Sequence, residues 1–288
     1  KYGADILRIW VASSNYAEDL RIDYSILDQH AESYRKIRNT FRYLLGNIND
    51  KFKTINFDEL DIDGLPELEQ LMLHKIYVLN NNFKKYFNNY DFHNLYKELL
   101  NFCTVDLSAF YFDIRKDNLY CDPPDSKKRK STILLLNIIL NALLKWFAPI
   151  LSFTTEEIFK LLFKDQKSIH LEKFLKFPDK FKNHKLNEKW IELIKIRNIC
   201  NISIEEKRAS KEIGSSLEAD LKIQMCQKLK NLTEKTDFSE LCITSKAEVS
   251  YKEDIETTAI TAKAKGSKCS ICWKIKETSC DRDNCAVN

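Results

Sequence analysis

Glycine and proline are scarce in this sequence, with five of each among 288 residues. So little glycine argues against a glycine-rich loop that binds nucleotide phosphates, because such loops need several glycines close together. The Gly-x-Ser-x-Gly nucleophile elbow of α/β hydrolases is also absent from the sequence. With few residues that interrupt helices, we expect long helices joined by few tight turns.

A catalytic centre built on histidines or carboxylates is not indicated either. The five histidines form no metal-ligand or catalytic spacing, and they stand at positions 30, 74, 93, 170 and 184. Carboxylates are numerous but unclustered along the chain. We therefore expect surface or packing roles for the histidines, and we predict no catalytic residue in this chain.

Charge and cysteine content limit the class of protein further. The formal net charge is +4, from 46 basic and 42 acidic residues, which permits a local nucleic-acid-binding surface without requiring one. Nine cysteines are dispersed, only the last four cluster, and no secretory signal segment opens the chain. These features predict a reducing compartment, so we expect a cytoplasmic location rather than a disulfide framework.

Apolar residues recur at three- and four-residue intervals through much of the chain. This spacing predicts a helix over residues 28–45, with Gly46 just past its C-terminus. Further helices are predicted to begin at Pro66, which suits a first helical turn, and after Asp91, which can cap a helix. Residues 154–157 have the Thr-x-x-Glu spacing of a capping box. Five or six amphipathic helices in succession predict a helical bundle.

One apolar run is long enough to be considered as a membrane span, residues 133–151. Asn137, Asn141 and Lys145 nevertheless place a polar stripe along one face of this run, and Pro149 ends it. A lysine inside a bilayer costs about 3 kcal/mol. We therefore expect a buried helix of the bundle and no membrane partner.

The last third of the chain has a different pattern. A helix is predicted from Trp190 to near Gly214. Two loosely alternating strands follow, over residues 219–225 and 241–251, joined by a short lysine-rich helix. Residues 255–268 have the composition of a polar linker. The sequence thus predicts a small α+β unit after the bundle.

The final twenty residues hold a cysteine cluster typical of a zinc site. Four thiolates satisfy tetrahedral zinc, and the Cys269-x2-Cys272 knuckle would supply two of them from one tight turn. Cys280 and Cys285 would supply the others, although four residues separate them where two are usual. A tail so poor in apolar residues needs a metal to fold. The alternative is two unrelated pairs of free cysteines.

Candidate nucleic-acid contacts are identified by residue type only. Trp273 follows the knuckle, and its ring would either stack on an unpaired base or cover the metal site. Arg35, Arg38 and Arg42 form a stripe on one helix and could contact phosphates, as could the basic run at 127–130. The alternative for these basic residues is a solvated surface.

Five segments, in order along nearly the whole chain, resemble those of bacterial-type isoleucyl-tRNA synthetases, a family of class I aminoacyl-tRNA synthetases. The first resembles the stretch after that family's lysine-rich catalytic loop, the second the opening helix of its anticodon-binding domain, and the last its zinc module. The segments are 2–22 (YGADILRIWVASSNYAEDLRI), 34–46 (YRKIRNTFRYLLG), 146–158 (WFAPILSFTTEEI), 208–219 (RASKEIGSSLEA) and 268–273 (KCSICW).

The resemblance implies a mainly α fold with four parts. These are the end of a catalytic core (1–25), an anticodon-binding helical bundle (26–185), a C-terminal α+β junction (186–254), and a linker with a zinc-finger-like tail (255–288). It further implies one Zn²⁺ in the tail, with Cys269, Cys272, Cys280 and Cys285 as its ligands.

The resemblance also implies a function for the complete enzyme, the ATP-dependent attachment of isoleucine to its tRNA. The nucleotide-binding signatures and editing domain of that family would lie upstream of Lys1, so ATP would bind outside this chain and the chain alone should be inactive. Its expected partners are isoleucine tRNA and the catalytic domain of the same enzyme. The alternatives are a free-standing RNA-binding module and the equivalent region of a valine or leucine enzyme.

Overall fold

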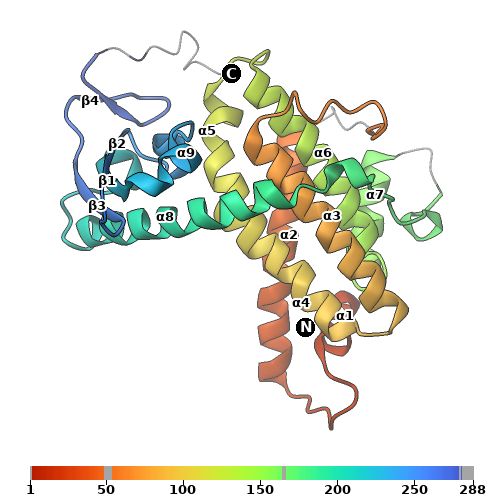
Figure 1. Cartoon of the computed structure of the whole chain (residues 1–288). Coiled ribbons are helices and arrows are strands. Elements are labelled where there is room, and N and C mark those ends of the chain that lie inside the picture. The colour runs from red at the N-terminus through yellow and green to blue at the C-terminus, as the bar shows by residue number, and fades with distance from the viewer. Residues whose placement is uncertain (1, 49–53, 164–166, 279, 281–288) are drawn as a thin grey trace. The chain divides into compact units, whose positions relative to one another are not determined.

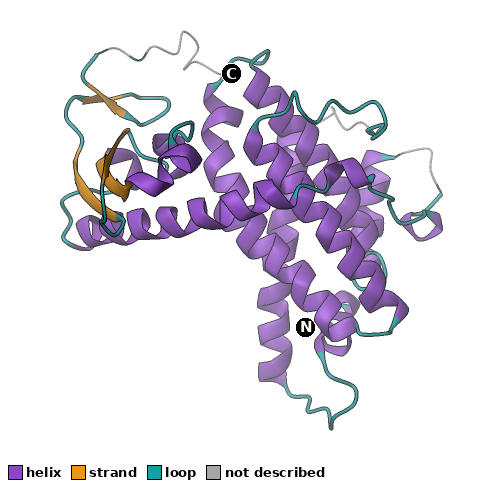
Figure 2. Ribbon diagram, viewed as in Figure 1, coloured by secondary structure: helices purple, strands orange, loops and turns teal. Residues whose placement is uncertain are grey.

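The computed structural model describes residues 2–48, 54–163, 167–278 and 280 (Figure 1). The chain divides into two compact units. The first unit comprises Lys1–Asp113 and Lys130–Asn183, and the second comprises Ile114–Arg129 and His184–Asn288. The predicted fold class, mainly α with a small sheet region, is confirmed (Figure 2). The predicted boundaries after residues 25, 185 and 254 separate functional parts rather than compact units, and they remain predictions.

The first unit is a bundle of helices, as the apolar periodicity predicts. A π-helical segment, Phe102–Phe112, continues directly from its fourth helix. The helices are α1 (Ala4–Ser13), α2 (Tyr24–Ile48), α3 (Glu67–Asn88), α4 (Phe92–Asn101), most of α6 (Lys127–Phe147) and α7 (Ser152–Leu162). Asp91 caps α4 as predicted, because its side chain accepts a hydrogen bond from the Asn94 backbone N–H at 3.2 Å.

The prediction that Gly46 lies just past the end of a helix is wrong. Helix α2 continues through Gly46 to Ile48, which is fully buried. A glycine inside a helix costs about 1 kcal/mol relative to alanine, whereas full burial of an isoleucine side chain contributes about 1.5–3 kcal/mol. Burial of Ile48 therefore explains why the helix does not stop at the glycine.

The core of the first unit is rich in aromatic side chains. Trp146 of α6 is fully buried, and its ring centroid lies 6.2 Å from that of Phe83 and 6.3 Å from that of Phe102. Its indole N–H donates to Asn80 Oδ1 at 3.2 Å, so the polar edge of the ring is satisfied inside the core. Phe147, next in sequence, lies edge-on to Phe41 of α2 at 6.1 Å.

Helix α6 is long and apolar enough to cross a membrane, as its sequence indicated. However, 72% of its most apolar window is buried inside the protein, which is typical of a core helix. The polar positions on this helix also have local partners. Asn137 donates to the Ile133 carbonyl at 2.8 Å, and Lys145 forms an ion pair with Glu172 at 3.2 Å. Burial and these contacts favour the predicted core helix over a span.

The start of α7 is capped by a residue from α1, so the predicted capping box at residues 154–157 is wrong. The buried carboxylate of Asp5 accepts hydrogen bonds from the backbone N–H groups of Phe153 and Thr154, at 3.2 and 2.8 Å. The Thr154 hydroxyl donates to the same carboxylate at 2.6 Å and is therefore not free to cap its own helix. A carboxylate at a helix N-terminus satisfies unpaired N–H groups and complements the helix dipole.

The second unit combines a long helix with a three-stranded sheet. The sheet has the order β2-β1-β3, in which β1 pairs parallel with β2 and antiparallel with β3. The residues of β1 alternate, with Ala219, Leu221, Ile223 and Met225 buried on one face. The elements are α5 (Asp113–Cys121), α8 (His184–Ala209), β1 (Ala219–Cys226), α9 (Lys230–Thr233), α10 (Phe238–Leu241), β2 (Lys246–Lys252) and β3 (Thr258–Lys263).

Two sequence-based expectations for the second unit are corrected. Strand β3 lies inside residues 255–268, which were predicted to be a linker. The prediction was wrong because a half-exposed edge strand has a polar composition like that of a linker. Strand β2 begins at Lys246 and not near Leu241, because α10 occupies Phe238–Leu241. A parallel pair needs a crossover connection, and the short helices α9 and α10 lie within it.

Candidate metal centre and nucleic-acid interface

Three of the four predicted zinc ligands come together in the second unit. The sulfur atoms of Cys269, Cys272 and Cys280 all lie within 4.8 Å of one another, and those of Cys272 and Cys280 are 3.9 Å apart. We call these three residues the thiol cluster. The fourth predicted ligand, Cys285, lies outside the described residues.

A tight turn positions the first two cysteines of the thiol cluster. Strands β4 (Ser267–Lys268) and β5 (Ile275–Lys276) form a short antiparallel pair on either side of the knuckle. The Cys269 N–H donates to the Lys274 carbonyl at 2.9 Å, and the Trp273 N–H donates to the Cys269 carbonyl at 3.1 Å. Gly266 begins this hairpin with a φ of +119°, and a Cβ there would collide with the backbone carbonyl of Lys276.

The spacing of the sulfur atoms fits a tetrahedral metal ion. With zinc–sulfur bonds of about 2.3 Å, tetrahedral geometry places sulfur atoms about 3.8 Å apart. The 3.9 Å separation of the Cys272 and Cys280 sulfurs matches this value. The thiol cluster could therefore hold a metal ion with thiolate ligands.

A fifth cysteine, Cys121 at the end of α5, lies against the thiol cluster. It is 6% exposed and packs with the buried Cys272, and Cys269 and Cys280 pack against the same group. Sequence reasoning did not identify Cys121, because no local spacing relates it to the tail. Only the folded chain brings these sulfur-bearing residues together.

Two buried cysteines outside this group, Cys103 and Cys242, have features of packing residues. Burial raises the pKa of the Cys103 thiol to about 12, so it remains neutral near pH 7. A hydrogen bond with Cys200, together with burial, raises the pKa of Cys242. Neutral buried thiols of this kind are poor nucleophiles and poor metal ligands.

The tail is attached to the rest of the second unit by polar contacts. Lys268 forms an ion pair with Glu218 at 3.1 Å, and Lys274 lies 4.0 Å from the carboxylate of Asp117 on α5. The Ile275 N–H donates to the Ser245 hydroxyl at 2.6 Å. These contacts hold the knuckle hairpin while leaving much of its surface exposed.

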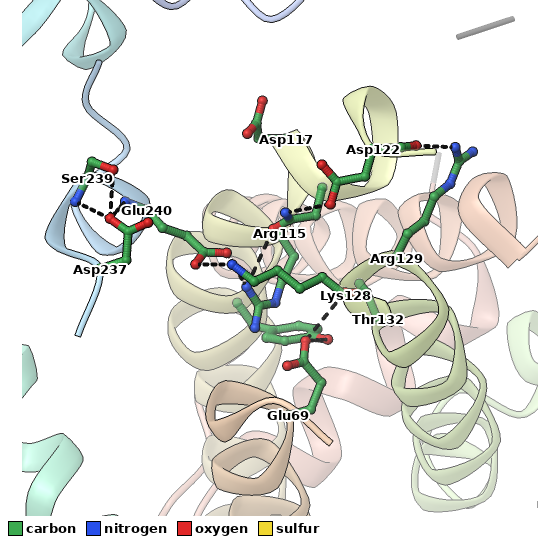
Figure 3. Close-up of polar contacts among 12 residues, drawn as sticks. Glu69, Arg115, Asp117, Asp122, Lys128, Arg129, Thr132, Asp237, Ser239 and Glu240 are labelled. Atoms are coloured by element: carbon green, nitrogen blue, oxygen red, sulfur yellow. Dashed lines mark hydrogen bonds and ion pairs between the residues drawn. The ribbon is translucent and has the colours of Figure 1, made fainter. Parts of the chain in front are cut away.

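The predicted basic run at residues 127–130 is partly used inside the second unit. Lys128 forms an ion pair with Glu240 at 2.7 Å, and the same carboxylate binds the buried Arg115 at 2.6 Å (Figure 3). Arg129 donates to the Asp122 carbonyl at 2.7 Å. Lys127 and Lys130 are exposed, so at most part of this run is available to phosphates.

The three predicted phosphate-binding arginines all lie exposed on α2 in the first unit. Their spacing of three and four residues places them on one face of the helix. Arg35 forms an ion pair with Glu32, and Arg38 donates to the Tyr34 hydroxyl at 3.0 Å. Such exposed contacts contribute little to stability and can exchange for phosphate contacts.

Trp273 is exposed in the second unit. The residue is 60% exposed and its backbone φ is +59°, a left-handed conformation that is uncommon for a bulky residue. A ring exposed to this extent does not bury the thiol cluster, which weakens the interpretation that Trp273 covers the metal site. The conformation leaves one ring available for stacking.

The described histidines have contacts consistent with structural roles. His74 is buried, and its Nδ1 accepts a hydrogen bond from the Asn183 N–H at 3.0 Å. His170 lies 3.2 Å from the Ser152 carbonyl. Burial lowers the pKa of His30.

The chain is similar to known proteins over nearly its whole length. The family model for the anticodon-binding domain of tRNA ligase matches residues 69–223, more than half of the chain. The isoleucine--tRNA ligase of Pelagibacter ubique (strain HTCC1062) is 69% identical over 282 residues, which cover 98% of this chain and 31% of that protein.

More distant relatives have the same name. The isoleucine--tRNA ligase of Bartonella henselae is 37% identical and that of Agrobacterium fabrum (strain C58) is 38% identical, each over 284 residues and 95% of this chain. The chain covers 29% of each of these two proteins, so it spans about a third of the length of the curated relatives it matches.

Proposed function

The chain belongs to the family of anticodon-binding domains of tRNA ligases, and on this basis we propose that it is the tRNA-binding C-terminal region of an isoleucine--tRNA ligase. The observation that carries the proposal is the match to the anticodon-binding family over residues 69–223, combined with 69% identity to a named isoleucine--tRNA ligase. In the complete enzyme, ATP-dependent attachment of isoleucine would take place in a catalytic part outside this chain. The proposed setting is the cytoplasm.

The role of this region would be to position the tRNA. Binding energy gained far from the reacting atoms holds a substrate in the productive orientation and thereby lowers the barrier to reaction. An anticodon-binding surface uses that energy to deliver the acceptor end of the tRNA to a distant catalytic site. The catalytic domain of the same enzyme is the corresponding protein partner.

The exposed residues suit recognition of a single-stranded loop. RNA loops are recognised by stacking unpaired bases on aromatic rings and by contacts to phosphates. Trp273 offers an exposed ring in the second unit, and Arg35, Arg38 and Arg42 offer exposed guanidinium groups in the first. We assign stacking to Trp273 and phosphate contacts to the three arginines.

We propose Zn²⁺ as the ion of the thiol cluster. Thiolate ligands favour zinc over the harder magnesium and calcium ions, and structural zinc sites are four-coordinate. The predicted fourth ligand is Cys285. When bound, zinc would supply folding energy to a tail with little apolar burial, and it would thereby fix the position of Trp273.

The test is binding of the full chain to isoleucine tRNA at near-physiological salt, with valine tRNA as competitor, with and without zinc. We expect preference for isoleucine tRNA, and loss of that preference when the metal is removed. The matched control replaces Lys222, an exposed lysine of β1, with glutamine (Lys222→Gln). This variant should bind as the wild type does.

Equal, strongly salt-dependent binding to both tRNAs would indicate only a non-specific basic surface and would contradict the proposal. Absence of binding to either would contradict tRNA recognition by this region alone. A free-standing RNA-binding module would bind unrelated single-stranded RNA as well as it binds tRNA. Preference for valine tRNA would instead assign the chain to a valine enzyme.

A further inference from the structure

A series of hydrogen bonds in the first unit connects the buried Asp5 to the exposed Arg38. The Thr154 hydroxyl donates to the Asp5 carboxylate at 2.6 Å, and the Tyr34 hydroxyl lies 2.9 Å from the Thr154 hydroxyl. The Arg38 guanidinium donates to the Tyr34 hydroxyl at 3.0 Å. We call these four residues the Asp5–Arg38 network. Asp5 and Thr154 are buried, whereas Arg38 is exposed, so the network links the core of the unit to its surface.

The direction of each hydrogen bond in the Asp5–Arg38 network follows from the chemistry of its two ends. An ionised carboxylate only accepts hydrogen bonds, and a guanidinium group only donates them. The single hydroxyl proton of Thr154 is used on Asp5, so the Tyr34 hydroxyl donates to Thr154. The oxygen of Tyr34 then accepts from Arg38. Every member therefore has a defined orientation, and bonds in such a series strengthen one another.

The network distinguishes Arg38 from Arg35, its neighbour in the arginine stripe of α2. Arg35 pairs with Glu32, an exposed residue of the same helix, so neither side chain is held by the core. The acceptor of Arg38 is instead Tyr34, which is half-buried and bonded to α7. The hydrogen bond with Tyr34 also raises the pKa of Arg38, with a smaller contribution from the Glu157 carboxylate. Arg38 is thus a charged group with a fixed support.

The contact with Tyr34 leaves much of the guanidinium group available. It uses Nη1, and within the described residues no hydrogen bond engages the edge formed by Nε and Nη2. The two N–H groups of that edge are parallel donors, which match two oxygens of one phosphate group. We propose that Tyr34 is a positioning residue, which holds Arg38 so that this edge binds one phosphate group of the tRNA backbone. This inference rests on the proposed tRNA-binding function.

A support of this kind strengthens phosphate binding in two ways. A freely moving arginine side chain loses rotamer freedom when it binds a phosphate, and that loss weakens binding. Tyr34 removes part of this freedom before the tRNA arrives, so less is lost in the complex. The Tyr34 hydroxyl is also uncharged, so it competes with a phosphate for the guanidinium group less than the Glu32 carboxylate competes for Arg35. The contact with Tyr34 can therefore persist while the phosphate is bound.

The test is binding of the full chain to isoleucine tRNA, measured by filter binding at several salt concentrations. Tyr34→Phe removes only the hydroxyl and should weaken binding about 3- to 10-fold, because Arg38 regains its freedom to move. The dependence on salt should not change, since the charge of Arg38 remains. Arg38→Gln should weaken binding at least as much, and it should lower the slope of log K against log salt by about 0.7 through loss of one phosphate contact.

A double-mutant cycle separates positioning of Arg38 from a general effect on folding. In the Arg38→Gln background, Tyr34→Phe should have no further effect on tRNA binding. A structural defect would instead weaken binding by the same factor in both backgrounds. Arg38→Lys keeps the charge but has no parallel pair of donors, so it should keep the salt slope and lose affinity. The matched control is Tyr86→Phe, which removes a hydroxyl that donates to Glu98 at 3.2 Å and should bind as the wild type does.

Two outcomes overturn the inference and leave the proposed function intact. One is wild-type affinity in Tyr34→Phe, and the other is an equal loss from Tyr34→Phe with and without Arg38, in a protein that still prefers isoleucine tRNA. Absence of tRNA binding in the wild type overturns the proposed function and this inference together. All variants are compared at urea concentrations below their unfolding transitions, so that each measurement reports on folded protein.

Discussion

In the first unit, the aromatic residues Trp146, Tyr111 and Phe41 are each less than 2% exposed to solvent. The tail of the second unit is the opposite case. Among its described residues from 267 to 280, only Cys272 is buried, whereas Ile271 is 43% exposed and Trp273 is 60% exposed. The bundle is stabilised by apolar area removed from water. The described tail residues instead make ion pairs and hydrogen bonds and contain the thiol cluster.

This contrast shows that the two regions should depend on different conditions. Apolar burial is insensitive to chelators and nearly insensitive to pH, because it involves no titrating group and no ligand. With the proposed zinc bound, the tail would depend on both, since zinc competes with protons for thiolates. A change that affects one region should therefore leave the other intact.

Removal of the proposed zinc is expected to have the largest effect. Structural zinc contributes about 10–16 kcal/mol of apparent binding free energy in zinc-finger peptides. A chelator should therefore abolish hydrogen-exchange protection of the knuckle, residues 267–276, whereas α3 and α6 keep theirs. Hydrogen-exchange mass spectrometry with and without chelator measures this. Equal loss of protection in α6 would contradict the separation of the two regions.

Trp146→Ala makes the converse change in the bundle. It removes a fully buried ring and its hydrogen bond to Asn80, so the free energy of unfolding of the first unit should fall by about 3–5 kcal/mol. Urea unfolding followed by circular dichroism measures this, and zinc affinity should not change. Trp273→Ala is the matched control and should cost less than about 0.5 kcal/mol, because that ring is exposed.

Asp5→Ala tests a polar contact on which the bundle depends. The substitution leaves the Phe153 and Thr154 N–H groups without their carboxylate partner at the start of α7. We expect a loss of about 2–3 kcal/mol in the same urea measurement. Asp23→Ala, which removes an exposed carboxylate that accepts from the Ile26 N–H, should cost clearly less than Asp5→Ala. Equal losses of unfolding free energy in the two variants would show that burial of Asp5 does not strengthen its contribution to stability.

The bundle could be predicted from the sequence because its signals are local. Apolar residues three and four apart report a buried helix face directly, and the cap at Asp91 is read from a single position. The extension of α2 through Gly46 could not be predicted in this way. It depends on the burial of Ile48, which is a property of the folded core.

The contacts that the sequence did not reveal join residues far apart in the chain. Neither the cap from Asp5 to α7 nor the packing of Cys121 on the thiol cluster has any spacing that marks it. Strand β3 was missed for a different reason. An edge strand with one exposed face has the polar composition of a linker, and only pairing with β1 distinguishes the two.

The tRNA-binding assignments can be separated between the two units by their salt dependence. Trp273→Ala should weaken isoleucine tRNA binding by about 1–3 kcal/mol through lost stacking, with no change in the salt slope. Replacement of Arg35, Arg38 and Arg42 with glutamine should lower the slope of log K against log salt by about 0.7 per lost phosphate contact. Filter binding at several salt concentrations measures both. Trp273→Phe, which keeps a ring, should restore much of the affinity, and a Trp273→Ala variant with wild-type affinity would exclude stacking.

The smallest expected effect concerns the pH dependence of the second unit. Asp237 caps α10, and its carboxylate accepts from the Ser239 and Glu240 N–H groups at 2.9 and 3.1 Å. Burial alone would raise its pKa, but these hydrogen bonds and one from the Ser239 hydroxyl hold the pKa of Asp237 below its ordinary value of 3.8. The contribution of the carboxylate to stability is thus fully present above that ordinary value.

That contribution disappears as the pH falls through the lowered pKa of the folded state, because the protonated acid gains nothing from folding. Asp237→Asn keeps a capping group but cannot titrate. The difference in unfolding free energy between wild type and Asp237→Asn should therefore be about 1 kcal/mol or less at neutral pH and should shrink below pH 3.8. A difference that grows on acidification would show that the folded protein favours the protonated acid. The metal-free chain is the one to measure, because protons would also displace the proposed zinc from the thiol cluster in this range.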